Sequence, residues 1–289
     1  MQAKHADMTG KTVILTGASR GIGRSTALAL GAAGADLGLV CRDAARADEA
    51  VGAVRAAGAR GAIDVFYADL SSLADMKRVA GEIDARYPRI DVLLNNAGGI
   101  FPERRSTVDG LEHTFAVNHL AYFVVTALLA PKLRASAPAR VVNVASTAHR
   151  GVALDFDDLQ SERGYSAFRV YSRSKLANVL FTRELARRLA GSGVTANCLH
   201  PGVIASHFGQ SEGGLLALVM KIGKPFLSTP EKGARTSVYL ASSPEVATVT
   251  GGYFDDCRVA KPSRQAQDDD AAARLFRVSE ELTGLTFPA

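Results

Sequence analysis

The sequence has no tryptophan and only three cysteines among its 289 residues. Cys41, Cys198 and Cys257 lie far apart and form no CxxC pair, and the histidines show no HExxH spacing. Disulfide frameworks and zinc sites depend on such clusters. We therefore expect neither a disulfide scaffold nor a metal site, and the cysteine usage favours a reducing compartment.

The sequence also lacks two kinds of concentrated segment. No apolar stretch follows the polar N-terminal residues, and no segment looks long and apolar enough to span a bilayer. The net charge of +5 is spread along the chain instead of forming a basic stripe. We therefore predict a cytoplasmic protein with no signal peptide, no transmembrane segment and no nucleic-acid partner.

The composition is that of a globular protein with a substantial core, because 47% of the residues are hydrophobic and 22% are charged. The length fits one large domain, and no linker, repeat or composition shift divides it. We predict a single domain over residues 1–289, with an appended C-terminal extension at about 258–289.

Apolar, strand-like segments alternate with helix-like segments along the chain. The predicted strands are residues 11–16, 35–41, 62–68, 90–94, 140–145 and 194–199. The predicted helices are about 23–33, 44–57, 71–86 (with Ser71 as N-cap), 110–134, 168–190 and 271–282. Continuous apolar strands separated by helices predict an α/β protein with a doubly wound, Rossmann-like parallel sheet and helices on both faces.

A glycine-rich turn lies between the first predicted strand and the first predicted helix. Its glycines allow the backbone to turn tightly, and the helix N-terminus offers free N–H groups to a phosphate. We therefore predict a pyrophosphate-binding turn formed by Gly17, Ser19, Arg20, Gly21, Ile22 and Gly23. The alternative is a tight packing turn without a ligand.

The end of the second predicted strand bears on cofactor choice. NAD enzymes carry an acidic residue there for the ribose hydroxyls, whereas this sequence has Arg42, with Arg20 in the preceding turn. Two guanidinium groups suit a 2′-phosphate, so NADP(H) is the preferred cofactor and NAD(H) the alternative. In that alternative, Arg42 is merely solvated, and Asp43 supplies the acid or caps the next helix.

Several motifs follow in order after these elements. They are Asp69-Leu70, Asn95-Asn96-Ala97-Gly98, Asn118 within VNHL, Ser146 after the fifth strand, Tyr171-Ser172-Arg173-Ser174-Lys175 and Pro201-Gly202 after the sixth. Together with the glycine turn, they resemble the short-chain dehydrogenase/reductase family over nearly the whole chain. The resemblance implies an oxidoreductase that moves a hydride between a nicotinamide cofactor and a carbonyl/alcohol pair. It adds to the cofactor site Asp69, Leu70, Asn96, Ala97, Gly98, Tyr171, Lys175, Pro201, Gly202, Val203 and Ser206.

A closer resemblance is to the retinol-dehydrogenase-like branch of that family. It rests on Cys41-Arg42-Asp43, the run KLANVLF from Lys175, His200-Pro201-Gly202-Val203, and Tyr253-Phe254-Asp255-Asp256-Cys257. The long separation of Ser146 from Tyr171 is also similar. Many branch members carry an N-terminal membrane segment that this sequence does not show, so membrane residence and a retinoid substrate do not carry over.

The chemistry expected of the site centres on Tyr171 and Lys175, which share one face of a predicted helix. A free tyrosine has a pKa of about 10, and a neighbouring ammonium and the oxidised nicotinamide favour its phenolate. Tyr171 then acts as general acid or base, while Ser146 polarises the substrate oxygen. By resemblance, Asn118 holds a water that relays protons to Lys175. The alternatives are a surface Tyr–Lys pair, a serine cap and a satisfied core asparagine.

Residues 205–228 are predicted to form a substrate lid, and their apolar part at 213–227 suggests a hydrophobic substrate. That part could instead pack on the core or touch a membrane. Rival functions are an NAD-linked alcohol dehydrogenase and a non-catalytic cofactor-sensing regulator, although the Ser–Tyr–Lys set favours an enzyme. Apolar helices at 116–129 and 176–189 could pair in a homo-oligomer or be covered within the monomer.

Overall fold

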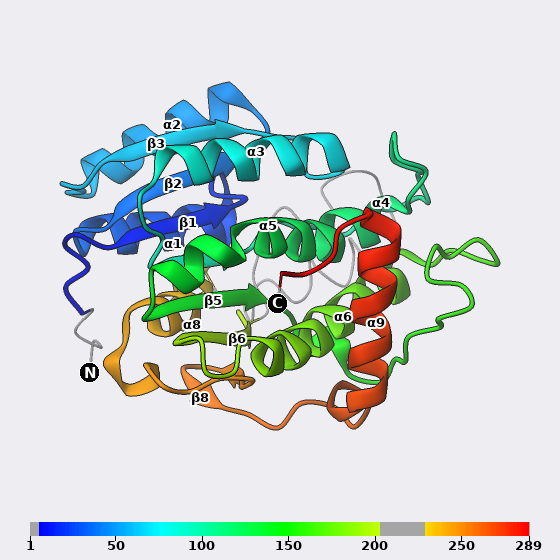
Figure 1. The fold of residues 1–289 in the computed structure, drawn as a ribbon. Helices are drawn as coiled ribbons and strands as arrows, with labels where there is room; N and C mark the ends of the chain where they lie inside the picture. Colours follow the sequence, from blue (N-terminus) through cyan, green and yellow to red (C-terminus); the bar gives the residue numbers. More distant parts are fainter. Residues whose placement is uncertain (1–5, 203–228, 289) are drawn as a thin grey trace.

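The computed structural model describes residues 6–202 and 229–288, which form an α/β fold around one eight-stranded sheet (Figure 1). The strand order is β3-β2-β1-β4-β5-β6-β7-β8, and only the β7–β8 pair is antiparallel. The strands are β1 (Thr12–Thr16), β2 (Asp36–Cys41), β3 (Ile63–Tyr67), β4 (Val92–Asn95), β5 (Ala139–Val144), β6 (Val194–His200), β7 (Tyr253–Asp255) and β8 (Arg258–Val259).

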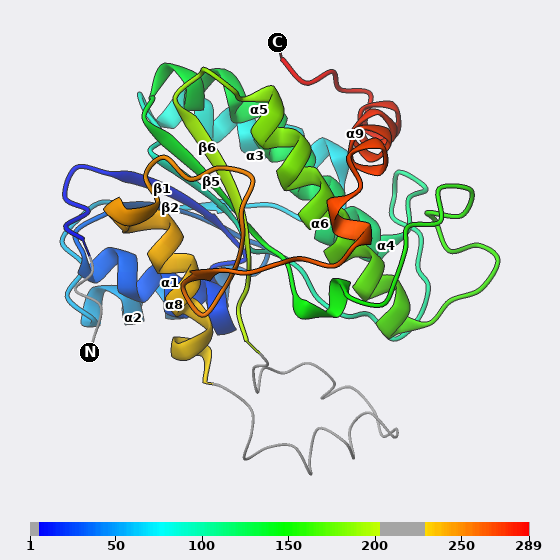
Figure 2. The same cartoon turned by 90° about the horizontal axis from the view of Figure 1, so that it is seen from below.

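Both faces of the sheet are covered, which explains why its central strands are continuously apolar. In β1, Val13 and Leu15 pack into one core cluster and Ile14 into the other, and all three are fully buried. The helices are α1 (Gly21–Ala32), α2 (Ala44–Ala56), α3 (Leu73–Arg86), α4 (His113–Phe115), α5 (Ala121–Ala135), α6 (Ala167–Arg188), α8 (Pro230–Ser242) and α9 (Asp269–Thr283). Figure 2 shows α1, α2 and α8 on one face and α3, α5 and α6 on the other.

The doubly wound parallel sheet and its six predicted strands are confirmed, with small shifts of their ends. Among the described residues, the unpredicted elements include the short edge strands β7 and β8 and the helix α8. The predicted N-cap of α3 was wrong by one residue. Ser72 Oγ accepts a hydrogen bond from Asp75 N at 3.3 Å, whereas Ser71 Oγ donates to Asp69 Oδ1 at 2.8 Å.

The prediction that no segment could span a bilayer was wrong by length and composition. Residues His113–Ala135 form a continuous helical stretch of 23 residues that is apolar enough. The structure buries 83% of its most apolar window inside the fold. The segment is therefore a core helix whose apolar character comes from burial on all sides.

The C-terminal extension is part of this core and not an appendage. The Phe276 ring of α9 lies 5.2 Å from the Phe123 ring of α5 and 5.9 Å from the Phe181 ring of α6. Nearby, His119 Nε2 lies 3.0 Å from Ser279 Oγ, again joining α9 to the centre of the molecule. These contacts cover the apolar sides of α5 and α6 within the monomer. Homo-oligomer formation stays a prediction.

Candidate active site

The predicted site residues gather at the carboxyl ends of the central strands, where the strand order reverses. The chain leaves β1 toward β2 and β3 and returns to β4 on the other side, and such switch points form ligand crevices in doubly wound sheets. Thr16 Oγ1 accepts hydrogen bonds from Asn96 N at 2.9 Å and Ala97 N at 3.1 Å. Asn96 Nδ2 donates to Gly17 O at 3.1 Å. These bonds join the glycine turn to the loop of residues 96–98.

The glycine turn combines a packing requirement with an open face. A Cβ on Gly23 would lie 2.1 Å from Gly17 O, so only glycine lets the two segments meet. Gly21, in contrast, has a φ of +51° and open space where a Cβ would be. Helix α1 begins there, and within the described part of the chain the side chain of its N-cap residue, Arg20, forms no capping hydrogen bond. Close packing explains Gly23, whereas the uncapped N–H groups beside open space fit the pyrophosphate of a dinucleotide.

The end of β2 resolves the role of Asp43. Its Oδ1 accepts a hydrogen bond from Arg46 N at 2.9 Å, so Asp43 caps α2 as one of the sequence alternatives stated. Arg42 and Arg20 are both exposed. The pKa of His113 is lowered mainly by burial, with Arg42 adding to the effect and Asp69 opposing it. The charges of Arg42 and Asp69 are therefore both close enough to His113, on α4, to shift its pKa.

Asp69 and Leu70 follow β3 and lie in a tightly bonded loop. Asp69 Oδ1 accepts hydrogen bonds from Ser71 N at 3.0 Å and Ser71 Oγ at 2.8 Å, while Asp69 N donates to Asp75 Oδ2 at 2.9 Å. Leu70 is buried. The loop is thus held in shape by its own hydrogen bonds, and its predicted contact with the cofactor stays a prediction.

The structure brings Ser146, Tyr171 and Lys175 together. Ser146 follows β5, and its hydroxyl forms a hydrogen bond with Tyr171 on α6. Lys175, one turn further along α6, donates to Val144 O at 3.1 Å, and its Nζ lies 5.6 Å from the centre of the Tyr171 ring. Lys175 is buried, so the pair is not an ordinary surface pair. Ser146 does also act as a cap, because its Oγ accepts from Ala148 N at 3.1 Å.

Asn118 lies in a π-helical turn, Ala116–Leu120, between α4 and α5. Its Oδ1 accepts from Gly99 N, and its Nδ2 donates to Gly99 O and Ser174 Oγ, each at 2.9 Å. The side chain is therefore a satisfied core amide, and the water-relay role stays a prediction. A Cβ on Gly98 would lie 2.9 Å from Asn118 Oδ1 and 3.5 Å from Lys175 Nζ. The loop after β4 thus adjoins Lys175.

Burial dominates the electrostatics of the pair on α6. It raises the pKa of Tyr171 above the usual value, although the hydrogen bond from Ser146 opposes the shift. It also lowers the pKa of Lys175 to about 7. This differs from the expectation that the lysine ammonium lowers the pKa of the phenol. The physical reason is that both groups are desolvated, and desolvation disfavours the charged form of each.

The loop after β6 lies next to the residues that follow Ser146. Gly202 has a φ of +85° directly after Pro201. The preceding His200 accepts a hydrogen bond at Nδ1 from Thr147 N at 3.2 Å, which ties this loop to the residues after Ser146. Val203, Ser206, the predicted lid at 205–228 and its apolar part at 213–227 lie outside the described residues.

Four polar residues of the site went unpredicted. Thr16 joins two loops, and Ser174 Oγ donates to Tyr171 O at 2.7 Å while accepting from Asn118. Asn178 Nδ2 donates to Asn118 O at 2.9 Å and to Val144 O at 3.3 Å. Their closeness to predicted residues in the sequence was the available signal. His149, close to Ser146 in the sequence, offered the same signal, but its distant partner Ser263 offered none.

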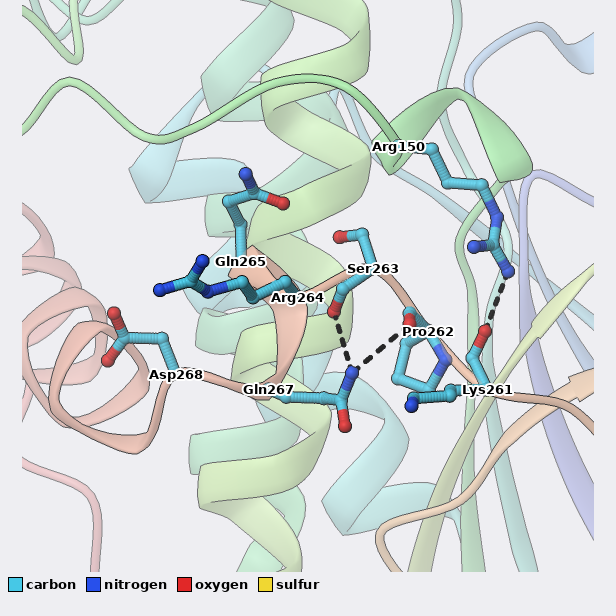
Figure 3. Close-up of a pocket in the computed structure, with 8 residues that line it drawn as sticks. All are labelled: Arg150, Lys261, Pro262, Ser263, Arg264, Gln265, Gln267 and Asp268. Atoms are coloured by element: carbon cyan, nitrogen blue, oxygen red, sulfur yellow. Dashed lines mark hydrogen bonds between the residues drawn. The ribbon is translucent and has the colours of Figure 1, made fainter.

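A separate surface hollow of about 1000 Å³ lies over the C-terminal segment (Figure 3). Its walls are supplied by Arg150, residues 261–265, Gln267 and Asp268, and none of the predicted site residues that the structure describes lines it. The hollow is therefore not the catalytic crevice, although its wall at Arg150 lies close in sequence to Ser146.

Comparison with known proteins agrees with this geometry. The family model for short chain dehydrogenase matches residues 11–213. Retinol dehydrogenase 14 from Mus musculus is 44% identical, over 96% of this chain and 87% of the relative. A putative uncharacterized protein from Mycobacterium Paratuberculosis has a TM-score of 0.79 and 32% identity, over 99% of this chain and 98% of the other. The Pseudomonas aeruginosa RhlG/NADP active-site complex has a TM-score of 0.70 and 28% identity, over 88% and 97%.

Proposed function

Since the chain belongs to the short-chain dehydrogenase family and is a retinol-dehydrogenase-like oxidoreductase, we propose a more specific activity for it. It transfers a hydride between NADP(H) and the carbonyl/alcohol pair of a hydrophobic substrate. The observation that carries this proposal is the Ser146–Tyr171 hydrogen bond beside buried Lys175, at the switch point of the sheet.

Tyr171 is the general acid in carbonyl reduction and the general base in alcohol oxidation. Ser146 already forms a hydrogen bond with the Tyr171 hydroxyl, so both can contact one substrate oxygen. When Tyr171 gives up its proton, its negative charge favours the ammonium form of Lys175. A nicotinamide bound beside Tyr171 would supply or accept the hydride, and its oxidised ring would add a positive charge.

The preference for NADP(H) is supported by the end of β2. Asp43 caps α2, while Arg42 and Arg20 are exposed. A guanidinium forms strong, charge-assisted hydrogen bonds with phosphate oxygens, and the ribose of NAD offers no such group.

A lipophilic alcohol or aldehyde of the retinoid class is the proposed substrate. The support is the 44% identity to a protein named retinol dehydrogenase, together with the apolar sequence at 213–227. A long apolar chain needs a pocket lined by such residues.

The test uses the purified full chain with NADPH and NADH, against aldehydes, ketones, quinones and retinal, and with the matching alcohols in reverse. We expect turnover of lipophilic carbonyls with NADPH. Tyr171→Phe abolishes turnover but keeps NADPH binding in a fluorescence titration. Tyr239→Phe is the matched control, because that hydroxyl donates to Glu245, an exposed residue of the 3-10 turn that follows α8.

Retained activity in Tyr171→Phe would overturn the assignment of the general acid. A clear preference for NADH would overturn the cofactor choice, and good turnover of small polar carbonyls alone would overturn the substrate class. Cofactor binding without turnover across the panel would favour the regulatory alternative.

A further inference from the structure

A fully buried histidine lies behind the catalytic serine. His149 ends the short 3-10 turn, Thr147–His149, that follows Ser146, and none of its surface is accessible. Its Nδ1 lies 2.6 Å from Ser146 O. Its Nε2 accepts a hydrogen bond from Ser263 N at 3.0 Å. The ring therefore joins the catalytic turn to a segment more than one hundred residues away.

The two partners fix the protonation of the ring. A backbone N–H can only donate, so Nε2 must be the unprotonated nitrogen that accepts from Ser263. A neutral imidazole then carries its proton on Nδ1, which donates to Ser146 O. Only one tautomer satisfies both bonds.

The bond to Ser146 is the shortest of those that close this turn. Ser146 O also accepts from His149 N at 3.2 Å, and Ser146 Oγ accepts from Ala148 N at 3.1 Å. The imidazole holds the carbonyl oxygen of Ser146 at 2.6 Å. It therefore fixes the orientation of the peptide group between Ser146 and the next residue, with which this turn begins. That orientation determines where Ala148 N holds the serine hydroxyl.

The C-terminal segment around Ser263, which His149 contacts, is held in place by further bonds. Arg150 Nη2 donates to Lys261 O at 2.6 Å, and Gln267 Nε2 donates to Pro262 O and Ser263 O at 3.2 Å each (Figure 3). The Tyr253 ring packs edge-on against His149 with ring centres 5.0 Å apart. Ser263 N therefore approaches His149 from a rigid segment.

We propose that His149 is a positioning residue, which holds the Ser146 hydroxyl in its reactive place through the Ser146 carbonyl and is itself aligned by Ser263. This inference rests on the proposed dehydrogenase function. It assigns to the C-terminal segment a role in the catalytic geometry, because that segment selects the tautomer that Ser146 needs.

Two substitutions separate the two bonds. In His149→Asn, the amide nitrogen takes the place of Nδ1 and keeps the donor to Ser146 O, while the bond to Ser263 is lost. In His149→Gln, the amide oxygen takes the place of Nε2 and keeps the bond to Ser263, while the donor to Ser146 O is lost. Arg150→Leu is the control, because it removes one of the bonds that anchor the segment, the one to Lys261 O, and leaves both bonds of His149 in place.

We expect kcat of the Asn variant to stay within about threefold of wild type and kcat of the Gln variant to fall at least about tenfold, the range of one misplaced polar group. KM for NADPH should change less than about twofold in both, and kcat of Arg150→Leu should stay near wild type. Melting temperatures measured alongside report any loss of folding. Rescue of kcat by Asn, and not by Gln, is an outcome that a purely structural role would not give.

Equal kcat in the Asn and Gln variants, or a larger loss in Asn, would overturn the inference. If the Gln variant does not fold, the Asn variant alone decides, and a tenfold loss of its kcat refutes the positioning role. Wild type and Tyr171→Phe are run in the same assay. An active wild type and an inactive Phe variant keep the proposed function even where His149 fails, whereas an inactive wild type overturns both.

Discussion

Buried His119 makes the stability of this protein sensitive to acid. Burial lowers the pKa of this imidazole from 6.5 to about 4, and its nitrogens lie near Asn178 Oδ1 and Ser279 Oγ at 3.4 and 3.0 Å. The unfolded chain therefore binds a proton more readily than the folded chain. The stability that comes from keeping His119 neutral is fully present above pH 6.5. It falls as the pH drops from 6.5 toward 4, and it does not change further below pH 4. The shift corresponds to about 3 kcal/mol in full, and about 2 kcal/mol of it is lost by pH 5.

Urea unfolding of wild type and His119→Gln at pH 7.5 and pH 5 measures this effect. The variant starts less stable, because it loses ring packing against Phe115 and Phe181. Between the two pH values, however, wild type should lose about 2 kcal/mol more than the variant, since glutamine does not titrate. His113→Gln is the control, because that ring is only partly buried and should change the pH slope less. Equal pH slopes in wild type and His119→Gln would refute the reasoning.

Four further substitutions test the cofactor site, helix α3 and the core. Arg42→Ala should raise KM for NADPH about tenfold in steady-state assays, the loss of one charged hydrogen bond worth about 1.5 kcal/mol, with KM for NADH nearly unchanged; equal effects on both would contradict it. Gly23→Ala should abolish NADPH binding in calorimetry, because its Cβ would lie 2.1 Å from Gly17 O. Gly81→Ala, where a Cβ meets nothing within 4 Å, should instead raise the free energy of unfolding by up to ~1 kcal/mol. Phe276→Ala should lower the free energy of unfolding by about 3–5 kcal/mol in urea titrations, and a loss below about 1 kcal/mol would show that α9 is not part of the core.

The central strands were predictable from the sequence because burial on both faces leaves an uninterrupted apolar signal. Strand β8 (Arg258–Val259) has two exposed residues and therefore no such signal. Helix α8 was missed although Thr229 and Pro230 form a typical helix start, with Thr229 Oγ1 accepting from Lys232 N at 3.3 Å. Parallel topology also brought many of the predicted site residues together, since the glycine turn, Asp69-Leu70, the 96–98 loop, Ser146 and Pro201-Gly202 each follow the end of a strand. Asn118, Tyr171 and Lys175 reach the same place from helical segments.

Two features of the site could not be predicted from the sequence: the lowered pKa of Lys175, which depends on desolvation, and the bond between His149 and Ser263, which joins distant parts of the chain. The spacing of Tyr171 and Lys175 predicts a shared helix face, but the lowered pKa of Lys175 follows from burial under neighbouring elements. Likewise, no local pattern pairs His149 with Ser263, because the two meet only when the C-terminal segment folds back across the sheet edge.

The order of synthesis gives the packing of α9 a consequence for the cell. The ribosome completes α5 and α6 well before α9, so Phe123 and Phe181 stay uncovered until Phe276 arrives. A premature stop codon before residue 269 would release a chain with exposed aromatic side chains on α5 and on the catalytic helix α6. Chaperones and proteases recognise such exposed apolar surfaces. A late nonsense mutation would therefore lower the amount of this protein in the cell more than it lowers the catalytic rate of each molecule.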